Sequence, residues 1–481
     1  MKQAVFSLCL ASLFVATGNA FAGPNIQQWT APTGARVQFV EIHDLPMLDV
    51  QIDFPAGSAY DPPAKSGVAS FTNSLLDAGA GELDEQAIAD KSADLGLVLG
   101  GSTSEDRASL SLRTLSSAAE RDAAVELAAT VLAHPRFPLE VLERERNRAR
   151  AGLKESLTKP ATLAARAFNA AIYGSHPYGA NVDDASLTTL TRDDLIAFHA
   201  RHYGANTALV TLVGDIDRET AEHIALTLTF GLPTDAPTPG PLPKPALPEP
   251  QENHIANPSA QAHILVGLPG MSRDDPDYFP LLVGNYVLGG GGFVSRLTHE
   301  VREKRGLAYS VYSYFEPRQV AGPFTIGLQT KGSQSKLALQ LVRDNLASFI
   351  HDGPSADELQ AAKDNLINGF GLRLDANRKI LDYVAIIGFY GLPADWLERY
   401  PREVDAVSRE AIRDAFARRV LPEHLVTIIA GGDGDTSPPP APAHEAAASE
   451  EPQTPADDST PPPVVESSPV IKPEAETAPA Q

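Results

Sequence analysis

The chain has 481 residues, a length that allows two or three domains, and 43% of its residues are hydrophobic, which is enough for packed cores. Its formal net charge is −22, and an acidic chain argues against nucleic-acid binding, which needs a basic face. The acidic excess is uneven, because the stretch from Thr436 onward holds eight acidic residues and one lysine.

The first 22 residues are typical of a cleaved export signal. Lys2 supplies a positive charge, residues 4–15 are mostly apolar, and residues 20–22 read Ala-Phe-Ala, a small-x-small cleavage site. The apolar run is too short to span a bilayer comfortably. We therefore expect cleavage after residue 22 and export to the periplasm, and an uncleaved anchor is the alternative. Cys9, the only cysteine, lies in this segment, so the mature chain would have neither a disulfide nor a cysteine-based metal site.

Residues 23–230 form the first predicted domain, in which strands and helices mix. Alternating or short buried apolar runs predict strands over 37–54, 107–115 and 208–213. Helical spacing predicts helices over 66–77, 118–132, 139–156 and 191–203. Ser66 and Thr191 are the expected N-caps of the first and last of these helices. This mixture fits an α+β domain.

Two proline-rich segments flank the second predicted domain, residues 251–434. Residues 231–250 contain eight prolines in twenty positions, which is typical of a semi-rigid spacer that holds two domains apart while they move as rigid bodies. Residues 435–481 contain twelve prolines together with many alanines, glutamates and serines. Such a composition cannot bury a core, so we expect a disordered tail that is dispensable for folding.

The two domains repeat each other at one constant offset. Residues 138–143 (Pro-Leu-Glu-Val-Leu-Glu) fall on 355–360 (Ser-Ala-Asp-Glu-Leu-Gln), and in the same register 171–174 (Ala-Ile-Tyr-Gly) fall on 388–391 (Gly-Phe-Tyr-Gly). One inserted residue then brings residues 197–201 onto 415–419. The repeat predicts two homologous α/β-sandwich domains, each an antiparallel-rich sheet with helices on one face, joined by the proline-rich linker. Two unrelated α+β domains are the alternative.

The most informative stretch, residues 67–81, begins Gly-Val-Ala-Ser-Phe-Thr-Asn-Ser. It resembles the zinc-site helix, Gly-x-Ala-His-x-x-Glu-His, of the insulinase/pitrilysin-type zinc metallopeptidases, which include the mitochondrial processing peptidase. The two histidine positions hold Ser70 and Ser74, and the glutamate position holds Asn73. These residues replace poorly the imidazoles that bind Zn²⁺ and the carboxylate that takes a proton from its water. The resemblance therefore implies no metal and no cofactor in this chain.

The third zinc ligand of such enzymes is also missing. The resemblance places a glutamate well downstream of the second histidine, at a distance that in this chain reaches Arg150 and Ala151, with Glu145 and Glu155 off register. Three histidines offer no substitute site. His199 and His202 share a predicted helix face without a third ligand, and His176 lies in a His-Pro-Tyr-Gly turn that these proteins also have. We interpret all three as packed or surface histidines.

The second domain keeps the other half of such a site. Residues 302–309 read Arg-Glu-Lys-Arg-Gly-Leu-Ala-Tyr, similar to the family's substrate-binding pair of an arginine and a tyrosine seven positions later, Arg302 and Tyr309. The resemblance implies that Tyr309 stabilises the tetrahedral intermediate and Arg302 binds substrate backbone. Without the family context, Arg302 would be one solvated charge of a basic cluster and Tyr309 one of several aromatics.

Two further stretches match the family. Gly289, Gly290, Gly291 and Gly292 lack the Gly-Lys-Ser/Thr ending of a phosphate-binding loop and look like the family's mobile glycine-rich loop, with a flexible helix-end turn as the alternative. Residues 100–109 match the edge strand to which substrates pair. Their sequence here is weakly strand-forming, so substrate pairing on this subunit is doubtful. The whole resemblance covers residues 28–432.

These residues predict an exported, non-catalytic subunit of a heteromeric zinc metallopeptidase. A homologous partner chain would carry the His-x-x-Glu-His site and the zinc, facing Arg302 and Tyr309, and unfolded peptides would be the substrates. The main alternative is a scaffold or assembly subunit without a proteolytic role, like the core subunits of a respiratory complex that resemble these peptidases. A self-sufficient peptidase is disfavoured because the ligands are missing. No membrane span is expected in the mature chain.

Overall fold

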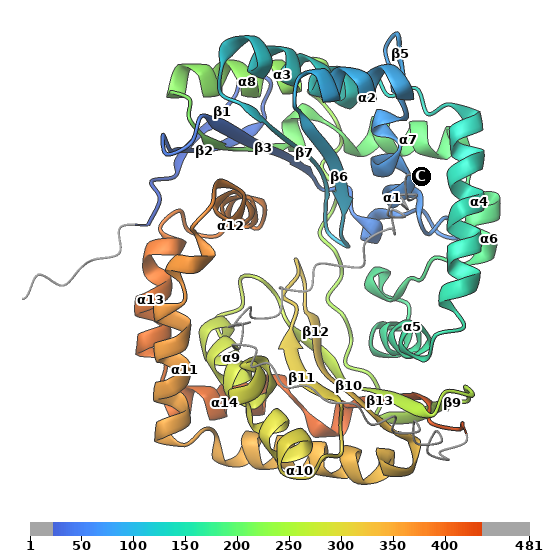
Figure 1. Cartoon of the computed structure of the whole chain (residues 1–481), viewed down its shortest axis with the longest axis vertical. Coiled ribbons are helices and arrows are strands. Elements are labelled where there is room, and N and C mark those ends of the chain that lie inside the picture. The colour runs from blue at the N-terminus through green and yellow to red at the C-terminus, as the bar shows by residue number, and fades with distance from the viewer. Residues whose placement is uncertain (1–22, 435–481) are drawn as a thin grey trace, which may run out of the picture.

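The structure is a computed structural model that describes residues 23–434, in which two similar halves lie one above the other (Figure 1). The predicted signal segment 1–22 and the predicted tail 435–481 lie outside the described residues. No helix within the described range combines the length and the apolarity needed to cross a bilayer.

The first half is built on a six-stranded sheet of order β1-β2-β8-β3-β7-β6, in which only the β2/β8 pair is parallel. Its strands are β1 (Gln27–Thr30), β2 (Arg36–Glu41), β3 (Met47–Phe54), β6 (Val98–Thr103), β7 (Ala108–Leu115) and β8 (Leu209–Gly214), beside the small pair β4 (Gly79–Ala80) and β5 (Leu83–Asp84). Its helices are α1 (Val68–Ser74), α2 (Glu85–Asp94), α3 (Ala118–Ala133), α4 (Leu139–Ser156), α5 (Pro160–Tyr173), α6 (Asp184–Thr189), α7 (Arg192–His202) and α8 (Arg218–Phe230).

The second half is built on a five-stranded sheet of order β11-β12-β10-β13-β9, in which only the β13/β9 pair is parallel. Its strands are β9 (Gln251–Ile255), β10 (Gln261–Met271), β11 (Ser310–Phe315), β12 (Gly322–Lys331) and β13 (Val426–Gly431). Its helices are α9 (Tyr278–Asn285), α10 (Ser335–Asp352), α11 (Ala356–Asn368), α12 (Asn377–Phe389), α13 (Trp396–Ala406) and α14 (Arg409–Arg419).

The repeat is visible in the element bounds. Helices α7 and α14 begin and end at the same offset that relates position 138 to position 355, strands β8 and β13 do the same, and helices α5 and α12 begin at that offset. The inserted residue expected within the repeat is therefore wrong, because α7 and α14 match without it. The buried positions follow the same offset, since Leu195 and Phe198 of α7 correspond to Ile412 and Ala415 of α14.

The predicted fold class is confirmed, and the structure adds an exchange of helices between the halves (Figure 1). Helix α5 of the first half packs against β13 and β10 of the second, and α12 of the second packs against β8 and β3 of the first. Phe168 and Ile172 of α5 join Val426 and Ile428 of β13 in one buried apolar cluster. The second face of each sheet is thus covered by a helix of the other half, while the half's own helices cover the first face.

The linker does not act as the independent spacer predicted from its prolines. The Asn206 amide donates to the carbonyl of Ala236 at 2.9 Å, His176 Nε2 lies 2.8 Å from the carbonyl oxygen of Pro243, and His424 Nδ1 lies 2.8 Å from that of Pro248. Because proline has no N–H group, carbonyl oxygens of the linker lack backbone donors. Side chains of both halves contact three of these oxygens instead. The prediction that the halves are held apart is therefore wrong.

A buried carboxylate at the turn between β6 and β7 also joins the halves. Asp106 is 1% exposed and accepts hydrogen bonds from the Tyr178 hydroxyl of the first half, from the Tyr390 hydroxyl at 2.8 Å and from the Gln319 N–H at 2.8 Å. Arg318, also buried, pairs with Glu105 at 2.9 Å beside it. A buried charge is tolerated when it is fully hydrogen-bonded, so this cluster fixes one arrangement of the two halves.

Candidate functional site

Helix α1 carries the predicted zinc positions, and Asp61 rather than Ser66 fixes where it begins. The Asp61 carboxylate accepts hydrogen bonds from the N–H groups of Gly67 and Ala69, both at 2.7 Å, and burial raises the pKa of Asp61 to about 6. Gly67 occupies the N-cap position with φ of +106°, which favours glycine. The predicted Ser66 cap is wrong, because a carboxylate from the preceding turn satisfies the free N–H groups of the helix.

Asn73, at the position of the catalytic glutamate, is held in a structural role. It is 4% exposed, and its amide donates to the carbonyl of Ser109 at 3.1 Å and to the Tyr203 hydroxyl at 3.4 Å. A Cβ atom on Gly101 would collide with Asn73 Oδ1, so β6 packs directly on this side chain. Asn73 therefore connects α1 to β6, β7 and the end of α7.

The strand beside it is more regular than its composition predicts. All six residues of β6 pair with β7, from Val98 opposite Arg113 to Thr103 opposite Ala108. Its Gly100-Gly101 pair is tolerated because Gly101 must leave room for Asn73. β6 is an edge strand of its sheet. The expectation of a poor strand is wrong, and substrate pairing to this edge stays untested.

The remaining zinc positions offer no ligand set. Ser70 is half-buried, and Ser74 is exposed and donates to the carbonyl of Phe71 at 3.3 Å. Arg150, near the position expected for the third ligand, forms a 2.7 Å ion pair with Asp184. Within residues 23–434, no group of three histidine, cysteine, aspartate or glutamate side chains is placed to hold a metal ion.

The three histidines considered as ligands are packed. His199 Nε2 lies 2.8 Å from the carbonyl oxygen of Leu132, and burial lowers the pKa of His199 to about 4. The buried ring of His202 packs on that of Phe198 at 4.4 Å, and burial lowers the pKa of His202 too. His176 contacts the linker. These positions agree with the structural interpretation of the three side chains.

Arg302 and Tyr309 are both exposed side chains of the second half, seven positions apart in the chain. Arg302 belongs to the helical segment Thr298–Glu303, and Tyr309 precedes β11, where its N–H donates to the carbonyl of Gln329 at 2.8 Å. The Tyr309 side chain is 51% exposed. Both predicted residues are thus exposed, and within the described residues no side-chain hydrogen bond or ion pair engages either of them.

The charges around Arg302 neutralise one another. Glu300 pairs with Lys304 and Arg305, each at 2.7 Å, and His299 lies 3.0 Å from Glu303. Arg302 takes part in none of these pairs. In the described part of the chain, the Arg302 side chain interacts with the ring of Phe293 alone, whose centroid lies 5.1 Å from Arg302 Cζ. All of its N–H donors are therefore available to a ligand.

The glycine run is helical rather than an open loop. Tyr286–Gly290 forms a π-helical segment and Gly292–Val294 a 3₁₀ turn. A Cβ atom on Gly289 would lie 2.5 Å from Ser313 N, and one on Gly291 would lie 2.7 Å from the carbonyl oxygen of Tyr286. Close packing explains these glycines. Gly290 is likewise crowded by Asn285, and only Gly292, with φ of +61°, faces open space.

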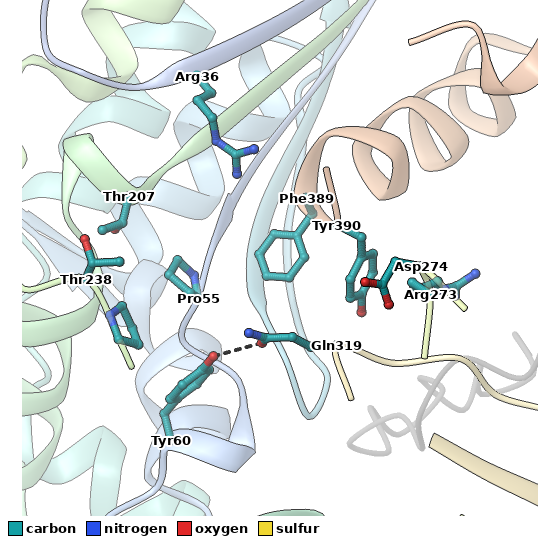
Figure 2. A pocket seen from close by; sticks show the side chains of 11 residues that line it. Arg36, Pro55, Tyr60, Thr207, Thr238, Arg273, Asp274, Gln319, Phe389 and Tyr390 are labelled. Carbon is teal, nitrogen blue, oxygen red and sulfur yellow. Dashed lines mark hydrogen bonds between the residues drawn. The ribbon is translucent and has the colours of Figure 1, made fainter. Parts of the chain in front are cut away.

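A separate cavity of about 320 Å³ lies at the seam between the halves (Figure 2). The Tyr60 hydroxyl donates to Gln319 Oε1 at 3.1 Å across this seam, and Arg36 donates to the carbonyl of Gly388 at 2.7 Å. None of the site residues predicted from the sequence lines this cavity. Its lining consists of Arg36, Pro55, Tyr60, Thr207, Thr238, Pro239, Arg273, Asp274, Gln319, Phe389 and Tyr390.

Two features of consequence escaped the sequence analysis. Asp106 looks like an ordinary turn residue in a Ser-Glu-Asp stretch, and nothing local shows that three donors converge on it. Phe293 and Val294 directly follow the four glycines, and both are largely exposed, at 69% and 74%. Two apolar residues after a glycine run were the available signal for a surface with a binding role.

Comparisons with known proteins identify the family. Family models described as "Insulinase (Peptidase family M16)" and "Peptidase M16 inactive domain" match residues 40–185 and 189–366. A crystal structure of a peptidase M16 inactive domain from Pseudomonas fluorescens is 38% identical, with a TM-score of 0.82, and the match covers 86% of this chain and 99% of that one.

Two curated relatives match over most of their length. The "Uncharacterized zinc protease YmxG" of Bacillus subtilis is 24% identical over 85% of this chain and 99% of its own. The "Non-peptidase homolog YmxG" of Helicobacter pylori is 26% identical over 86% of this chain and 95% of its own. On the strength of the family models and of the 38% identity to that crystal structure, the chain belongs to the insulinase family, peptidase family M16.

Proposed function

We propose that this chain is a non-catalytic subunit of a heteromeric zinc metallopeptidase. It supplies Arg302 and Tyr309 to a homologous partner chain that carries the His-x-x-Glu-His helix and the zinc. The observation that carries the proposal is the contrast between two exposed side chains without a polar partner, Arg302 and Tyr309, and an α1 helix whose Asn73 is buried and hydrogen-bonded. The matching inactive-domain family model and the non-peptidase relative support the absence of catalysis by the chain alone.

The chemistry of the pair suits peptide hydrolysis. The reaction passes through a tetrahedral oxyanion, which preorganised donors must meet. The Tyr309 hydroxyl offers one hydrogen bond, and the Arg302 guanidinium offers several donors to substrate carbonyls while it stays charged. Because both side chains are exposed here, they would become a site only when a partner surface covers them. Unfolded peptides held between the two chains are the proposed substrates.

Reconstitution tests this proposal. The mature chain alone should hold no stoichiometric zinc by metal analysis and should cleave no peptide. Mixed with a homologous M16 peptidase that carries the intact His-x-x-Glu-His motif, it should raise hydrolysis of a quenched fluorogenic peptide mixture well above that of the partner alone. About one tightly bound zinc per chain, lost with activity on chelation, would overturn the non-catalytic assignment.

Arg302→Ala distinguishes the proposal from a scaffold role. The substitution should raise KM because it removes substrate binding that exists before the transition state. Lys304→Ala is the matched control, since Lys304 lies on the same surface but is paired with Glu300. If Arg302→Ala forms the complex and keeps full activity, a scaffold or assembly role without proteolysis is the better account.

Export forms a second part of the proposal. The charged start, apolar run and Ala-Phe-Ala site of residues 1–22 support it. A full-length chain expressed in its natural host should be found in the periplasmic fraction and should begin at Gly23 by N-terminal sequencing. A mature protein that begins at Met1 in the cytoplasmic fraction would contradict it.

A further inference from the structure

We infer that Phe293 is a positioning residue that holds the Arg302 guanidinium ready for substrate. This inference rests on the proposed function, since Arg302 is the substrate-binding arginine of that proposal. Arg302 Cζ lies 5.1 Å from the centroid of the Phe293 ring, within the range of a cation–π contact. Within residues 23–434, no hydrogen bond or ion pair engages the Arg302 guanidinium.

The type of contact matters for binding. A cation–π contact stabilises the positive charge through the ring quadrupole and uses none of the five N–H donors. A carboxylate in the same place would occupy some of those donors, as Glu300 does for the neighbouring cations Lys304 and Arg305. Phe293 thus restricts where the guanidinium lies and leaves its hydrogen-bonding capacity for substrate carbonyls.

The backbone on either side of Phe293 is fixed by a glycine turn and by hydrogen bonds of Ser295. Gly292 has φ of +61°, which turns the chain sharply before Phe293. Fully buried Ser295 closes the turn, because its N–H and its hydroxyl both donate to the Gly292 carbonyl, at 3.1 and 2.7 Å. Ser295 also bonds Thr298, the first residue of the segment that carries Arg302, at 3.0 Å. The ring and the guanidinium therefore belong to two neighbouring segments that the Ser295–Thr298 hydrogen bond connects.

Exposure of the ring is unusual without such a role. Phe293 is 69% exposed, and a phenylalanine with so little burial gains little for folding. Val294 beside it is 74% exposed and has no ring to offer Arg302, so the two residues form a matched pair that differs in the cation–π contact. Substitution of either residue should leave the stability of the chain nearly unchanged.

The contact itself is tested in the chain alone. With arginine side chains labelled with ¹⁵N, the Nε–H resonance of Arg302, assigned by its loss in Arg302→Lys, should move in Phe293→Leu through the lost ring current. It should stay in place in Val294→Ala. A resonance that does not move in Phe293→Leu would overturn the inference.

The role is tested in the reconstituted complex with the quenched fluorogenic peptide mixture. Phe293→Leu should raise KM about two- to fivefold, as expected for an exposed cation–π contact, with kcat little changed. Phe293→Tyr should restore KM, and Val294→Ala should match the wild type. In the Arg302→Ala background, Phe293→Leu should have no further effect on KM.

The possible failures are separable. If Arg302→Ala raises KM but Phe293→Leu does not, the inference is wrong and the proposed function stands. If Phe293→Leu raises KM equally with and without Arg302, the ring acts directly on substrate and the positioning role is wrong. If Arg302→Ala and Tyr309→Phe both keep wild-type activity, the proposed function fails, whatever the behaviour of Phe293.

Discussion

The region around α1 and the surface that carries residues 293–309 differ in how their polar groups are used. Around α1, the buried amide of Asn73 and the half-buried carboxylate of Asp61 are hydrogen-bonded to neighbouring groups. On the surface of the second half, Arg302 and Tyr309 have no polar side-chain partner among the described residues. The polar groups of the first region therefore stabilise the fold, whereas the donors of Arg302 and Tyr309 remain free to bind a ligand. Substitutions in the two regions should therefore affect different properties.

The largest effect on stability is expected at Asp106, the buried carboxylate that joins the two halves. Asp106→Ala leaves two phenol hydroxyls and the Gln319 N–H without this acceptor, and should lower the free energy of unfolding by about 2–4 kcal/mol. Urea denaturation measures it. Asp274→Ala, which removes an exposed carboxylate at the same seam, is the control and should stay within about 0.5 kcal/mol.

The same variant tests how tightly the halves are joined. Trp29 and Trp396 are the only two tryptophans, one in each half, so Trp29→Phe and Trp396→Phe chains report on one half each by fluorescence. In the wild-type background both reporters should give the same urea midpoint. Asp106→Ala should separate the midpoints. Distinct midpoints without that substitution would show that the exchanged helices do not couple the halves.

A smaller loss of stability is expected at Asn73. Asn73→Ala removes two buried hydrogen bonds and leaves the Ser109 carbonyl without that donor, so the free energy of unfolding should fall by about 1–3 kcal/mol. Ser74→Ala is the control on the exposed side of α1 and should change little. Equal stability of Asn73→Ala and the wild type would contradict the structural role assigned to this amide.

His199 predicts a dependence of stability on pH. Burial puts its pKa at about 4 in the folded chain, below the ordinary value of about 6.5 in the unfolded chain. Between these values the unfolded chain binds more protons, so this contribution to stability is present above pH 6.5 and is lost as the pH falls toward 4.

The slope due to His199 can be at most about 1.4 kcal/mol per pH unit. His199→Gln should remove it from urea titrations at pH 5 and 7, and exposed His351→Gln should not. If the free energy of unfolding of His199→Gln changed with pH as steeply as that of the wild type, the His199 ring would be protonated in the folded chain. That result would contradict a packed, neutral histidine.

The smallest effects on stability are expected where the groups are unengaged. Arg302→Ala and Tyr309→Phe remove no hydrogen bond or ion pair of the described chain, so the free energy of unfolding should change by less than about 0.5 kcal/mol. A loss of several kcal/mol in either variant would remove the contrast between the two regions.

The sequence predicted regular elements well and contacts between distant elements poorly. Residues 139–156 were predicted as a helix and form α4, and the Thr191 cap of α7 was expected, because periodicity and capping are local properties. The exchange of α5 and α12 follows from the packing of two apolar helix faces on distant sheets, which no local pattern records. The Asp106 cluster likewise depends on residues that are distant in the chain and meet only in the fold, whereas the Asp61 cap is a local contact that the sequence analysis missed.

The site residues also differ in how well the sequence could predict them. Arg302 and Tyr309 follow from a short contiguous motif, and both side chains are exposed in the structure. For the glycine run, composition left a mobile loop and a turn at a helix end both open, and the structure shows a helical segment followed by a turn. Glycine marks a mobile loop and a tightly packed helix equally, and only the closeness of Ser313 to Gly289 distinguishes them. The apolar pair after the glycines was a signal in the sequence, but the exposure of Phe293 and its contact with Arg302 are properties of the fold.

The rate of peptide hydrolysis by the reconstituted complex with Tyr309→Phe tests the central claim most directly. The substitution removes one hydroxyl and little volume, so folding and pairing should survive. Loss of one oxyanion donor should lower kcat by about 10²–10³. Tyr312→Phe, at a neighbouring tyrosine that is 43% exposed, should keep kcat near the wild-type value. A Tyr309→Phe complex that forms normally and hydrolyses the same peptides at the wild-type rate would contradict the account and favour a scaffold.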